Sequence, residues 1–430
     1  MREMKVLVVG GGGREHVIAW KIRKSRWVSK VYCAPGNAGI AAVAECVDIK
    51  PTDIEALLDF ALDNGIDLTV VGPEAPLAMG IVDRFEEKGL RIFGPSKAAA
   101  RIESSKIFAK EIMRKYSIPT AGSETFTDLS KARDYVIRTG GPMVVKVDGL
   151  AAGKGAFPCE DEMEALKAID IIENGAFKEA GSRILIEEYL RGEEASILAF
   201  SDGKHVIPLE SAQDHKRVFD GDTGPNTGGM GAYSPAPVIS EDIASRVYDE
   251  ILMPTVRGMA AEGTPYKGIL YAGLMITDEG AKVIEFNCRF GDPEAQVVIP
   301  RMATDFIRPL LACCDGTLNR VNLRWSRSSC VCVVITSGGY PGSYKKGFEI
   351  KGLDKVERME NVVAFHAGTR EDGDGRILTN GGRVLGITAM GPDIKETIKL
   401  AYRAVRKVDF KDNFYRKDIG KKASYHLDGM

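Results

Sequence analysis

Several features are scarce in this sequence of 430 residues, and each absence excludes a class of protein. No apolar run approaches the 18 residues that a membrane-spanning helix needs, and glycines interrupt the apolar stretch at Lys5–Val9 before it could act as a signal peptide. No charge sign dominates either, because 58 Lys and Arg face 60 Asp and Glu, which argues against a protein that coats nucleic acid. We expect a cytoplasmic protein that binds neither a membrane nor nucleic acid.

Cysteine and histidine also lack the patterns that would give them a chemical role. The eight cysteines contain no C-x-x-C pair, and the five histidines are scattered without a Ser-His-Asp arrangement. We expect buried, reduced thiols and no cysteine nucleophile.

The remaining composition is that of a globular protein with about three units. Apolar runs alternate with helical patterns in the first hundred residues, which is typical of a parallel sheet covered by helices. We predict an α/β chain, α+β overall. It consists of an N-terminal parallel α/β domain at 1–103, a central domain at 104–328 interrupted by a compact lid at about 121–190, and a β-rich domain at 329–430.

Four glycines, Gly10–Gly13, follow the first predicted strand and suggest a dinucleotide site. A G-x-G-x-x-G fingerprint would need glycine where Glu15 or His16 stands, and the second strand ends near Pro35 without an acidic residue for the ribose. A helix N-terminus with free amides still attracts anions. We expect a phosphate or carboxylate pocket at Gly10–Glu15, with a structural turn or an NAD site as alternatives.

Two further loops follow strands of the same predicted sheet. They are Pro35–Gly39 and Gly72–Pro76. Ligands in open α/β sheets bind at the carboxyl ends of the strands. We therefore expect the three loops to converge on one small molecule.

A second glycine-rich loop, Asp148–Gly155, has a lysine but lacks the G-K-[ST] ending of a P-loop. Lys146 precedes it, Lys154 lies within it, and Lys106 belongs to an earlier predicted helix. Ammonium groups neutralise phosphate as point charges, so this set suits a nucleoside triphosphate. The alternative is a flexible hairpin with solvated lysines.

The stretch Glu187–Leu190, followed by Gly192–Ser196, reads as a strand end, a short hinge and a new strand. Hinge backbone groups could pair with an adenine edge, and a nearby carboxylate could accept from ribose hydroxyls. An exposed acidic turn explains the same residues.

The segment Lys282–Glu294 has a more specific pattern. Residues two apart in a strand share a face, so Glu285, Asn287 and Arg289 align if the strand continues to that point. A carboxylate and an amide oxygen on one face suit magnesium, which completes its shell with phosphate and water. A polar edge strand with a surface ion pair is the alternative.

Residues 211–235 are rich in glycine and have no clear predicted structure. Gln213–Arg217 and Asp222–Gly231 combine cations, carboxylates and bare backbone. Long segments of this kind are usually functional. We expect this one to bind a small zwitterionic or phosphorylated substrate.

Taken together, the motifs resemble a known family along nearly the whole chain. The matching segments are Gly10–His16, Ala34–Gly39, Val71–Leu77, Gln213–Arg217, Thr223–Ser234 and Glu285–Glu294. They are similar to the phosphoribosylamine–glycine ligases of purine biosynthesis, which are ATP-grasp enzymes.

The resemblance implies that ATP phosphorylates glycine to glycyl phosphate. The amine of 5-phosphoribosylamine would then attack, releasing phosphate besides ADP. The implied cofactor is Mg²⁺ or Mn²⁺, the implied partners are these small molecules, and a monomer is the working expectation.

The resemblance also assigns site residues, with Arg289 and Lys146 as the catalytic pair. The implied ATP-binding residues are Lys106, Lys146, Lys154, Glu187, Leu190 and Glu194; the substrate-binding residues are Gly12, Gly13, Arg14, Glu15, Gly72, Pro73, Glu74, Asp214, Lys216 and Arg289; the metal ligands are Glu285 and Asn287.

One departure from the wider superfamily concerns a second metal. Many ATP-grasp enzymes carry a metal carboxylate on the preceding strand, but Tyr271–Ile276 has none. The alternatives to the family reading are another ATP-grasp ligase, an NAD-dependent dehydrogenase and a non-catalytic phosphoribosyl-binding protein.

Overall fold

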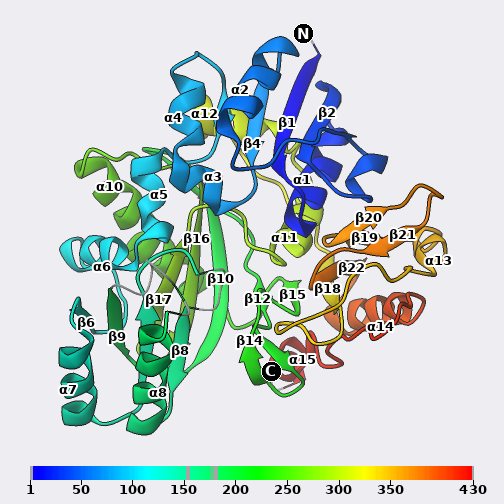
Figure 1. The fold of residues 1–430 in the computed structure, drawn as a ribbon. Helices are drawn as coiled ribbons and strands as arrows, with labels where there is room; N and C mark the ends of the chain where they lie inside the picture. The colour runs from blue at the N-terminus through cyan, green and yellow to red at the C-terminus, as the bar shows by residue number, and fades with distance from the viewer. Residues whose placement is uncertain (1–2, 152–154, 176, 178–182, 429–430) are drawn as a thin grey trace.

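The computed structural model describes residues 3–151, 155–175, 177 and 183–428, and it shows a mixed α/β chain, as predicted. Figure 1 places the N-terminal region in blue at the top, the central region in cyan to green, and the C-terminal region in orange to red at the side. In the part of the chain that is described, no helix is long and apolar enough to cross a membrane.

The N-terminal region forms a five-stranded parallel sheet in the order β3-β2-β1-β4-β5. Its strands are β1 (Met4–Gly10), β2 (Val28–Pro35), β3 (Glu45–Cys46), β4 (Leu68–Val71) and β5 (Ile92–Phe93). Its helices are α1 (Gly13–Arg23), α2 (Ile54–Asp63), α3 (Glu74–Met79), α4 (Ile81–Glu86) and α5 (Lys97–Ser104). The strand order reverses between β1 and β4, which is where ligands bind in such sheets.

The central region is built on an antiparallel sheet in the order β11-β10-β16-β17. Its strands are β10 (Glu193–Asp202), β11 (Val206–Pro208), β16 (Lys267–Thr277) and β17 (Gly280–Asn287). The helices of this region are α6 (Lys106–Lys115), α9 (Glu241–Arg246), α10 (Met253–Ala261), α11 (Ala295–Arg301) and α12 (Ile307–Asp315). A π-helical turn, η3 (Val247–Leu252), joins α9 to α10.

A small antiparallel sheet lies between α6 and β10 in the chain, in the segment predicted as a lid and called the lid below. Its order is β6-β9-β7-β8. Its elements are β6 (Ser123–Phe126), α7 (Leu129–Thr139), β7 (Met143–Val147), β8 (Ala156–Cys159), α8 (Glu162–Glu173) and β9 (Ile184–Glu188). Figure 1 shows these elements together at the lower left, beside β17.

The C-terminal sheet has the order β12-β15-β18-β22-β19, and two of its strands come from the middle of the chain. Its elements are β12 (Gln213–Asp214), β15 (Gly231–Ser234), β18 (Ser329–Thr336), β19 (Val362–His366), β22 (Arg383–Gly391) and α14 (Ile394–Val405). Short pairs flank it, β13 (Arg217–Phe219) with β14 (Thr223–Asn226) and β20 (Thr369–Glu371) with β21 (Ile377–Thr379), as do α13 (Leu353–Glu357) and α15 (Lys421–Asp428).

The expectation that residues 211–235 lack regular structure is therefore wrong. β15 pairs with β18, about a hundred residues later in the chain, and β12 pairs with β15. The partner that completes these short strands is distant in sequence, so no local pattern reveals it.

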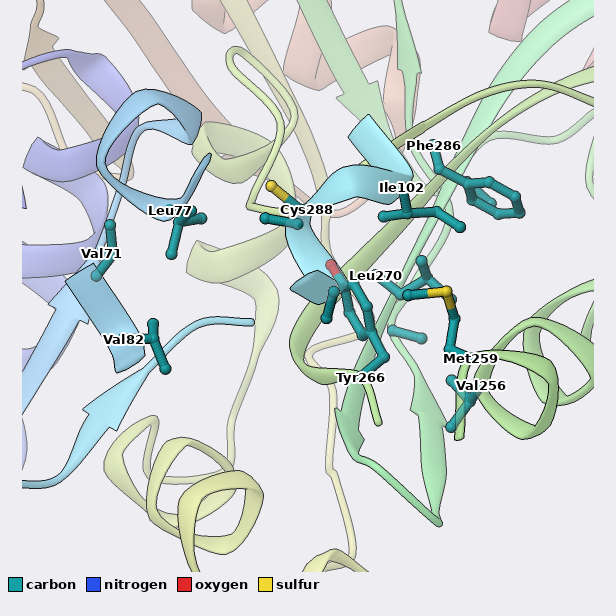
Figure 2. Close-up of a cluster of buried hydrophobic side chains, with 14 of the residues drawn as sticks. Val71, Leu77, Val82, Ile102, Val256, Met259, Tyr266, Leu270, Phe286 and Cys288 are labelled. Atoms are coloured by element: carbon teal, nitrogen blue, oxygen red, sulfur yellow. The ribbon is translucent and has the colours of Figure 1, made fainter. Parts of the chain in front are cut away.

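One continuous hydrophobic core joins the N-terminal and central regions. The side chains labelled in Figure 2 are Val71, Leu77, Val82, Ile102, Val256, Met259, Tyr266, Leu270, Phe286 and Cys288, and all belong to this buried cluster. Burying a large apolar side chain contributes about 1.5–3 kcal/mol. The packing fixes β17 relative to the loops that follow β1 and β4.

Candidate active site

The hinge between the lid and the central sheet contains a buried cluster of charges. Lys146, on β7, donates from Nζ to Glu187 Oε2 at 2.9 Å and to the carbonyl oxygen of Ile284 at 2.9 Å. Lys110, on α6, lies 3.3 Å from the same Glu187 oxygen. Glu187, at the end of β9, therefore faces two ammonium groups and not solvent.

The glycine-rich loop after β7 is tied to the start of α6. Lys106 Nζ donates to the carbonyl oxygen of Gly149 at 2.9 Å. Asp148 accepts from Ser105 Oγ and from the backbone N–H of Ile107, and it pairs with Arg183 at 2.6 Å. Lys154, the predicted phosphate ligand within this loop, lies outside the described residues.

A second charge cluster bridges the hinge and β17. Lys216 Nζ lies 3.0 Å from Glu194 Oε2 and 3.4 Å from Glu285 Oε1. Lys216, Lys146 and Lys106 lower the pKa of Glu285 to about 2 against the opposing effect of burial. Leu190 is buried beside this hinge. Glu285 is thus an anionic group at neutral pH.

Glu285 and Asn287 share one face of β17, as the alternation predicted. Their oxygen donors and the ionised carboxylate fit a hard divalent cation that takes its remaining ligands from phosphate and water. Within the described residues, no group of three or more His, Cys, Asp and Glu side chains could hold a metal alone. Gly273 faces Glu285 across the sheet, where a second carboxylate could otherwise stand.

Arg289 does not extend this row, because β17 ends at Asn287. Its guanidinium instead pairs with Glu74 Oε2 at 3.2 Å and with Glu103 Oε1 at 3.0 Å. Burial alone would lower the pKa of Arg289, but Glu103 and Glu74 raise it. The backbone N–H of Cys288 donates to Glu103 at 2.7 Å, so Glu103 holds the whole turn.

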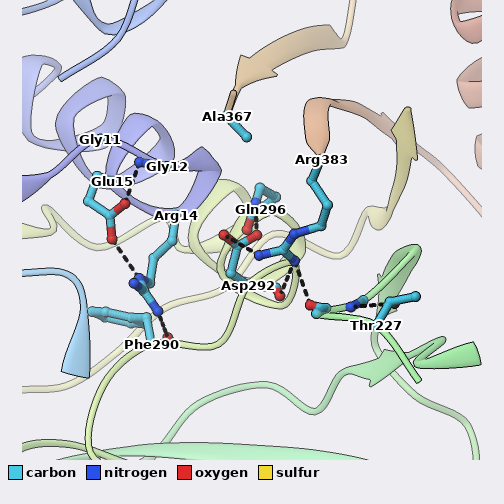
Figure 3. A network of polar contacts seen from close by, with 12 residues as sticks. Gly11, Gly12, Arg14, Glu15, Thr227, Phe290, Asp292, Gln296, Ala367 and Arg383 are labelled. Carbon is cyan, nitrogen blue, oxygen red and sulfur yellow. Dashed lines mark hydrogen bonds and ion pairs between the residues drawn. The ribbon is translucent and has the colours of Figure 1, made fainter. Parts of the chain in front are cut away.

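The turn after β1 is arranged around the carboxylate of Glu15. Figure 3 shows the N–H of Gly12 donating to Glu15 at 2.6 Å and Arg14 Nε pairing with Glu15 at 2.6 Å. A Cβ at Gly72 would lie 2.1 Å from Glu15 Oε1, so the loop after β4 also packs here, directly before Pro73 at the start of α3. The Glu15 carboxylate therefore accepts a hydrogen bond from one of the backbone N–H groups at the start of α1.

A third contact to this turn comes from the loop after β2. Asn37 donates to the carbonyl oxygens of Gly11 and His366, each at 2.9 Å. The three predicted loops therefore lie together, and β19 of the C-terminal sheet lies beside them.

The C-terminal sheet also contributes a cation that the sequence did not single out. Arg383 pairs with Asp292 at 3.1 Å and donates to the carbonyl oxygen of Asp292 at 2.7 Å and to that of Gly228 (Figure 3). Gln296 donates to Asp292 at 2.7 Å. A Cβ at Gly13 would lie 2.6 Å from Gln296, so Gly13 allows this close approach.

Asp214 and Glu294 form the acidic part of the site beside β16. Burial and then Glu294 raise the pKa of Asp214 to about 8. Glu294 accepts from Tyr271 at 2.8 Å, and the Tyr271 hydroxyl lies 2.7 Å from Ser196. Asp214 therefore carries a proton for part of the time at neutral pH.

The structure brings most of the predicted site residues together from the loops of the N-terminal sheet, from α6, from β7 and the hinge after β9, from residues 214–216, and from the end of β17. Sequence reasoning missed Lys110, Glu103, Asp292, Glu294 and Arg383. Asp292 and Glu294 belong to a quoted motif and could have been named. Each of the other three has its charged partner more than seventy residues away, so no local pattern marks that pairing.

Comparison with known families agrees with this architecture. Residues 4–103 match the N domain of phosphoribosylglycinamide synthetase, residues 104–295 its ATP-grasp (A) domain, and residues 330–422 its C domain.

Curated relatives match at full length. A protein named phosphoribosylamine–glycine ligase from Caldanaerobacter subterraneus subsp. tengcongensis is 51% identical over 417 residues, which is 97% of this chain and 99% of the relative. The Escherichia coli K12 protein of the same name is 51% identical over 424 residues, covering 98% and 99%.

Solved structures extend the comparison to the fold. A phosphoribosylamine–glycine ligase from Thermotoga maritima superposes with a TM-score of 0.84 at 32% identity, covering 96% of this chain and 100% of that one. The biotin carboxylase domain of Hydrogenobacter thermophilus 2-oxoglutarate carboxylase, solved with MgADP, has a TM-score of 0.75 at 17% identity, covering 100% and 96%, which shows a shared fold alone. This chain belongs to the phosphoribosylglycinamide synthetase family.

Proposed function

We propose that this chain joins glycine to 5-phosphoribosylamine at the expense of ATP, in purine biosynthesis. The products are glycinamide ribonucleotide, ADP and phosphate. The observation that carries the proposal is the full-length match to relatives named for this reaction. Glu285 and Lys216 lie where the residues proposed to bind ATP meet those proposed to bind the other substrates, and this arrangement supports the proposal.

On the ATP side, lysines neutralise the polyphosphate. Lys106 and Lys146, together with Lys154, would contact the phosphate oxygens. The backbone between Glu187 and Leu190 would pair with the adenine. The carboxylate of Glu194 would accept from the ribose hydroxyls.

Glu285 and Asn287 would hold Mg²⁺ or Mn²⁺. The ion would supply charge neutralisation on the transferring phosphoryl group. The ionised state of Glu285 and the oxygen donors on one strand face support this assignment.

The reaction has two steps. A carboxylate oxygen of glycine attacks the γ-phosphorus of ATP, the bond to the bridging oxygen breaks, and ADP leaves. The amine nitrogen of phosphoribosylamine then attacks the carbonyl carbon and loses a proton, and phosphate departs with the oxygen from glycine. Positioning and charge neutralisation accelerate both steps, and Lys146 and Arg289 would supply them.

On the substrate side, the loops of the N-terminal sheet would enclose the two substrates. The residues proposed here are Gly12, Gly13, Arg14, Glu15, Gly72, Pro73, Glu74, Asp214, Lys216 and Arg289. Their mixture of guanidinium, ammonium and carboxylate groups suits substrates that carry both charge signs. We place the enzyme in the cytoplasm, as a monomer.

The test is an ADP-release assay with phosphoribosylamine made in situ, comparing glycine with other amino acids. We expect ADP release to depend on both glycine and the amine. Release with a different acid and not with glycine would instead indicate another ATP-grasp ligase.

Isotope labelling tests the order of bond making. Glycine labelled with heavy oxygen in its carboxylate should pass one labelled atom to inorganic phosphate in each turnover. Unlabelled phosphate from a competent reaction would exclude glycyl phosphate.

A further inference from the structure

Lys110 is a buried lysine with no role in the proposed reaction. It lies on α6, one turn after Lys106, and its side chain is only 8% exposed. Its Nζ donates to Thr120 Oγ1 at 2.9 Å and to the carbonyl oxygen of Ala121 at 3.0 Å, and it lies 3.3 Å from Glu187. An ammonium group is buried only where it is well paired, so this set of contacts calls for an explanation.

The contacts join the two points at which the chain enters and leaves the lid. Thr120 and Ala121 lie in the segment that enters the lid, just before β6. Glu187 lies near the end of β9, where the chain leaves the lid. Thr120 also donates to the carbonyl oxygen of Val283 on β17 at 2.6 Å. One ammonium group therefore connects the two lid crossings and, through Thr120, the strand that carries Glu285.

The charges around Glu187 explain why a cation is useful here. Glu187 Oε2 lies 2.9 Å from Lys146 and 3.3 Å from Lys110. With two ammonium groups and one carboxylate, the cluster keeps a net positive charge. Without Lys110, Glu187 would neutralise Lys146 alone and hold it more tightly.

We propose that Lys110 is a positioning residue for ATP: it shares the charge of Glu187 so that Lys146 can contact phosphate, and it fixes both lid crossings. The proposal rests on the proposed function, because it takes Lys146 as a phosphate ligand. Burial lowers the pKa of Lys110 to about 8, which leaves the ammonium form dominant at neutral pH.

The first test compares Lys110→Met with the parent full-length chain. Methionine keeps the length of the apolar stem and removes the charge. We expect the affinity for a non-hydrolysable ATP analogue, measured by calorimetry with magnesium present, to fall at least tenfold. Adenosine binding should stay within twofold of the parent, since adenosine carries no phosphate. Equal binding of the analogue by a folded variant would overturn the proposal.

Lys115→Met is the matched control. Lys115 lies on the same helix, is 62% exposed and pairs with Glu262 at 2.6 Å. The same substitution there should leave the affinity for the analogue within twofold of the parent. A loss as large as that of Lys110→Met would show that any charge removed from α6 has this effect, and would overturn the proposal.

A double variant separates charge sharing from a merely structural role. Glu187→Gln combined with Lys110→Met releases Lys146 from the carboxylate. The affinity for the analogue divided by that for adenosine should then rise at least threefold above its value in Lys110→Met alone. A ratio that stays as low as in the single variant would overturn charge sharing.

Thr120→Val keeps the inference testable if Lys110→Met does not fold. Valine preserves the shape of Thr120 and removes one acceptor of Lys110, so we expect a smaller loss, about threefold, in analogue affinity and none in adenosine affinity. Unchanged analogue affinity would count against the proposal. If the parent chain binds no ATP analogue, the proposed function itself fails, and that result is distinct from a parent that binds and a variant that binds equally well.

Discussion

Around the lid hinge two buried lysines, Lys110 and Lys146, share one carboxylate, whereas around the turn after β17 arginines are outnumbered by carboxylates. The arginines of the second group are Arg14, Arg289 and Arg383, and its carboxylates are Glu15, Glu74, Glu103 and Asp292. Both regions are largely buried, but their charge balances are opposite.

The proposed function accounts for this difference in charge balance. A triphosphate is strongly anionic, so a cluster with spare positive charge suits it. Glycine and phosphoribosylamine carry amino groups and hydroxyls beside their anionic groups, so a mixed cluster suits them. The same reasoning predicts that charge removal has different consequences in the two regions.

The largest effect should come from Arg289→Ala. The substitution leaves Glu74 and Glu103, both partly buried, without their shared cation, and the about 3–5 kcal/mol for breaking a fully buried pair is the upper bound of the cost. We expect activity to fall at least ~100-fold, as on loss of a charge-stabilising group. Urea denaturation and steady-state kinetics measure the two effects.

Arg91→Ala is the control for this prediction. Arg91 pairs with Asp315 at 3.0 Å, but both side chains are about half exposed. Exposed pairs contribute about 0–1 kcal/mol, so neither stability nor activity should change much. A similar loss in both variants would show that burial does not distinguish them.

Glu285→Gln should have the next largest effect. The substitution keeps the shape and removes the charge where the two regions meet, and a charged contact is worth about 1.5–3 kcal/mol. Activity should fall at least ~10-fold, most clearly at limiting magnesium. Glu279→Gln, at the exposed turn before β17, is the control and should behave as the parent does. A Glu285 variant as active as the parent at limiting magnesium would remove this residue from the metal site.

Gly72→Ala probes the substrate side alone. Its Cβ would meet Glu15 at 2.1 Å and displace the carboxylate from Gly12. Losing a hydrogen bond of this kind costs about 1–2 kcal/mol, so KM for phosphoribosylamine should rise about tenfold while KM for ATP stays constant. Gly373→Ala, where a Cβ meets no described atom within 4 Å, should change neither constant. A rise in KM for ATP alone would show that Gly72 affects ATP binding and not the binding of phosphoribosylamine.

The last prediction concerns acid, and at neutral pH its effect is the smallest. Burial lowers the pKa of His16 to about 3 and that of His366 to about 4, so the unfolded chain binds protons first as the pH falls below about 6.5. Each buried histidine then removes about 1.4 kcal/mol of stability per pH unit between 6.5 and its folded pKa.

His16→Gln tests this, because glutamine can still accept the N–H of His366. Its unfolding free energy, measured from pH 7 to pH 5, should fall less than that of the parent, by about 2 kcal/mol over this range. Parallel curves would show that His16 does not contribute to the acid sensitivity of the junction between α1 and β19.

Local patterns predicted the parallel sheet, the hinge between β9 and β10, and the common face of Glu285 and Asn287, because each depends on neighbours in sequence. They did not predict the end of β17 before Arg289, since the pairing of β16 and β17 stops where the chain turns toward Glu103. Nor did they reveal Arg383 or Lys110, whose partners are brought close only by the packed fold.

The strand β15 crosses the boundary between two of the three matched domains, because it lies in the central region of the sequence and pairs with β18 of the C-terminal region. The Gln213–Arg217 motif is held in place through β15 by β18, so the central and C-terminal regions share one sheet. A chimera that exchanged residues 330–422 alone would set a foreign strand against β15 and shift Lys216 away from Glu285. Recombination between relatives at a crossover near residue 329 should therefore separate β15 from its native partner strand β18.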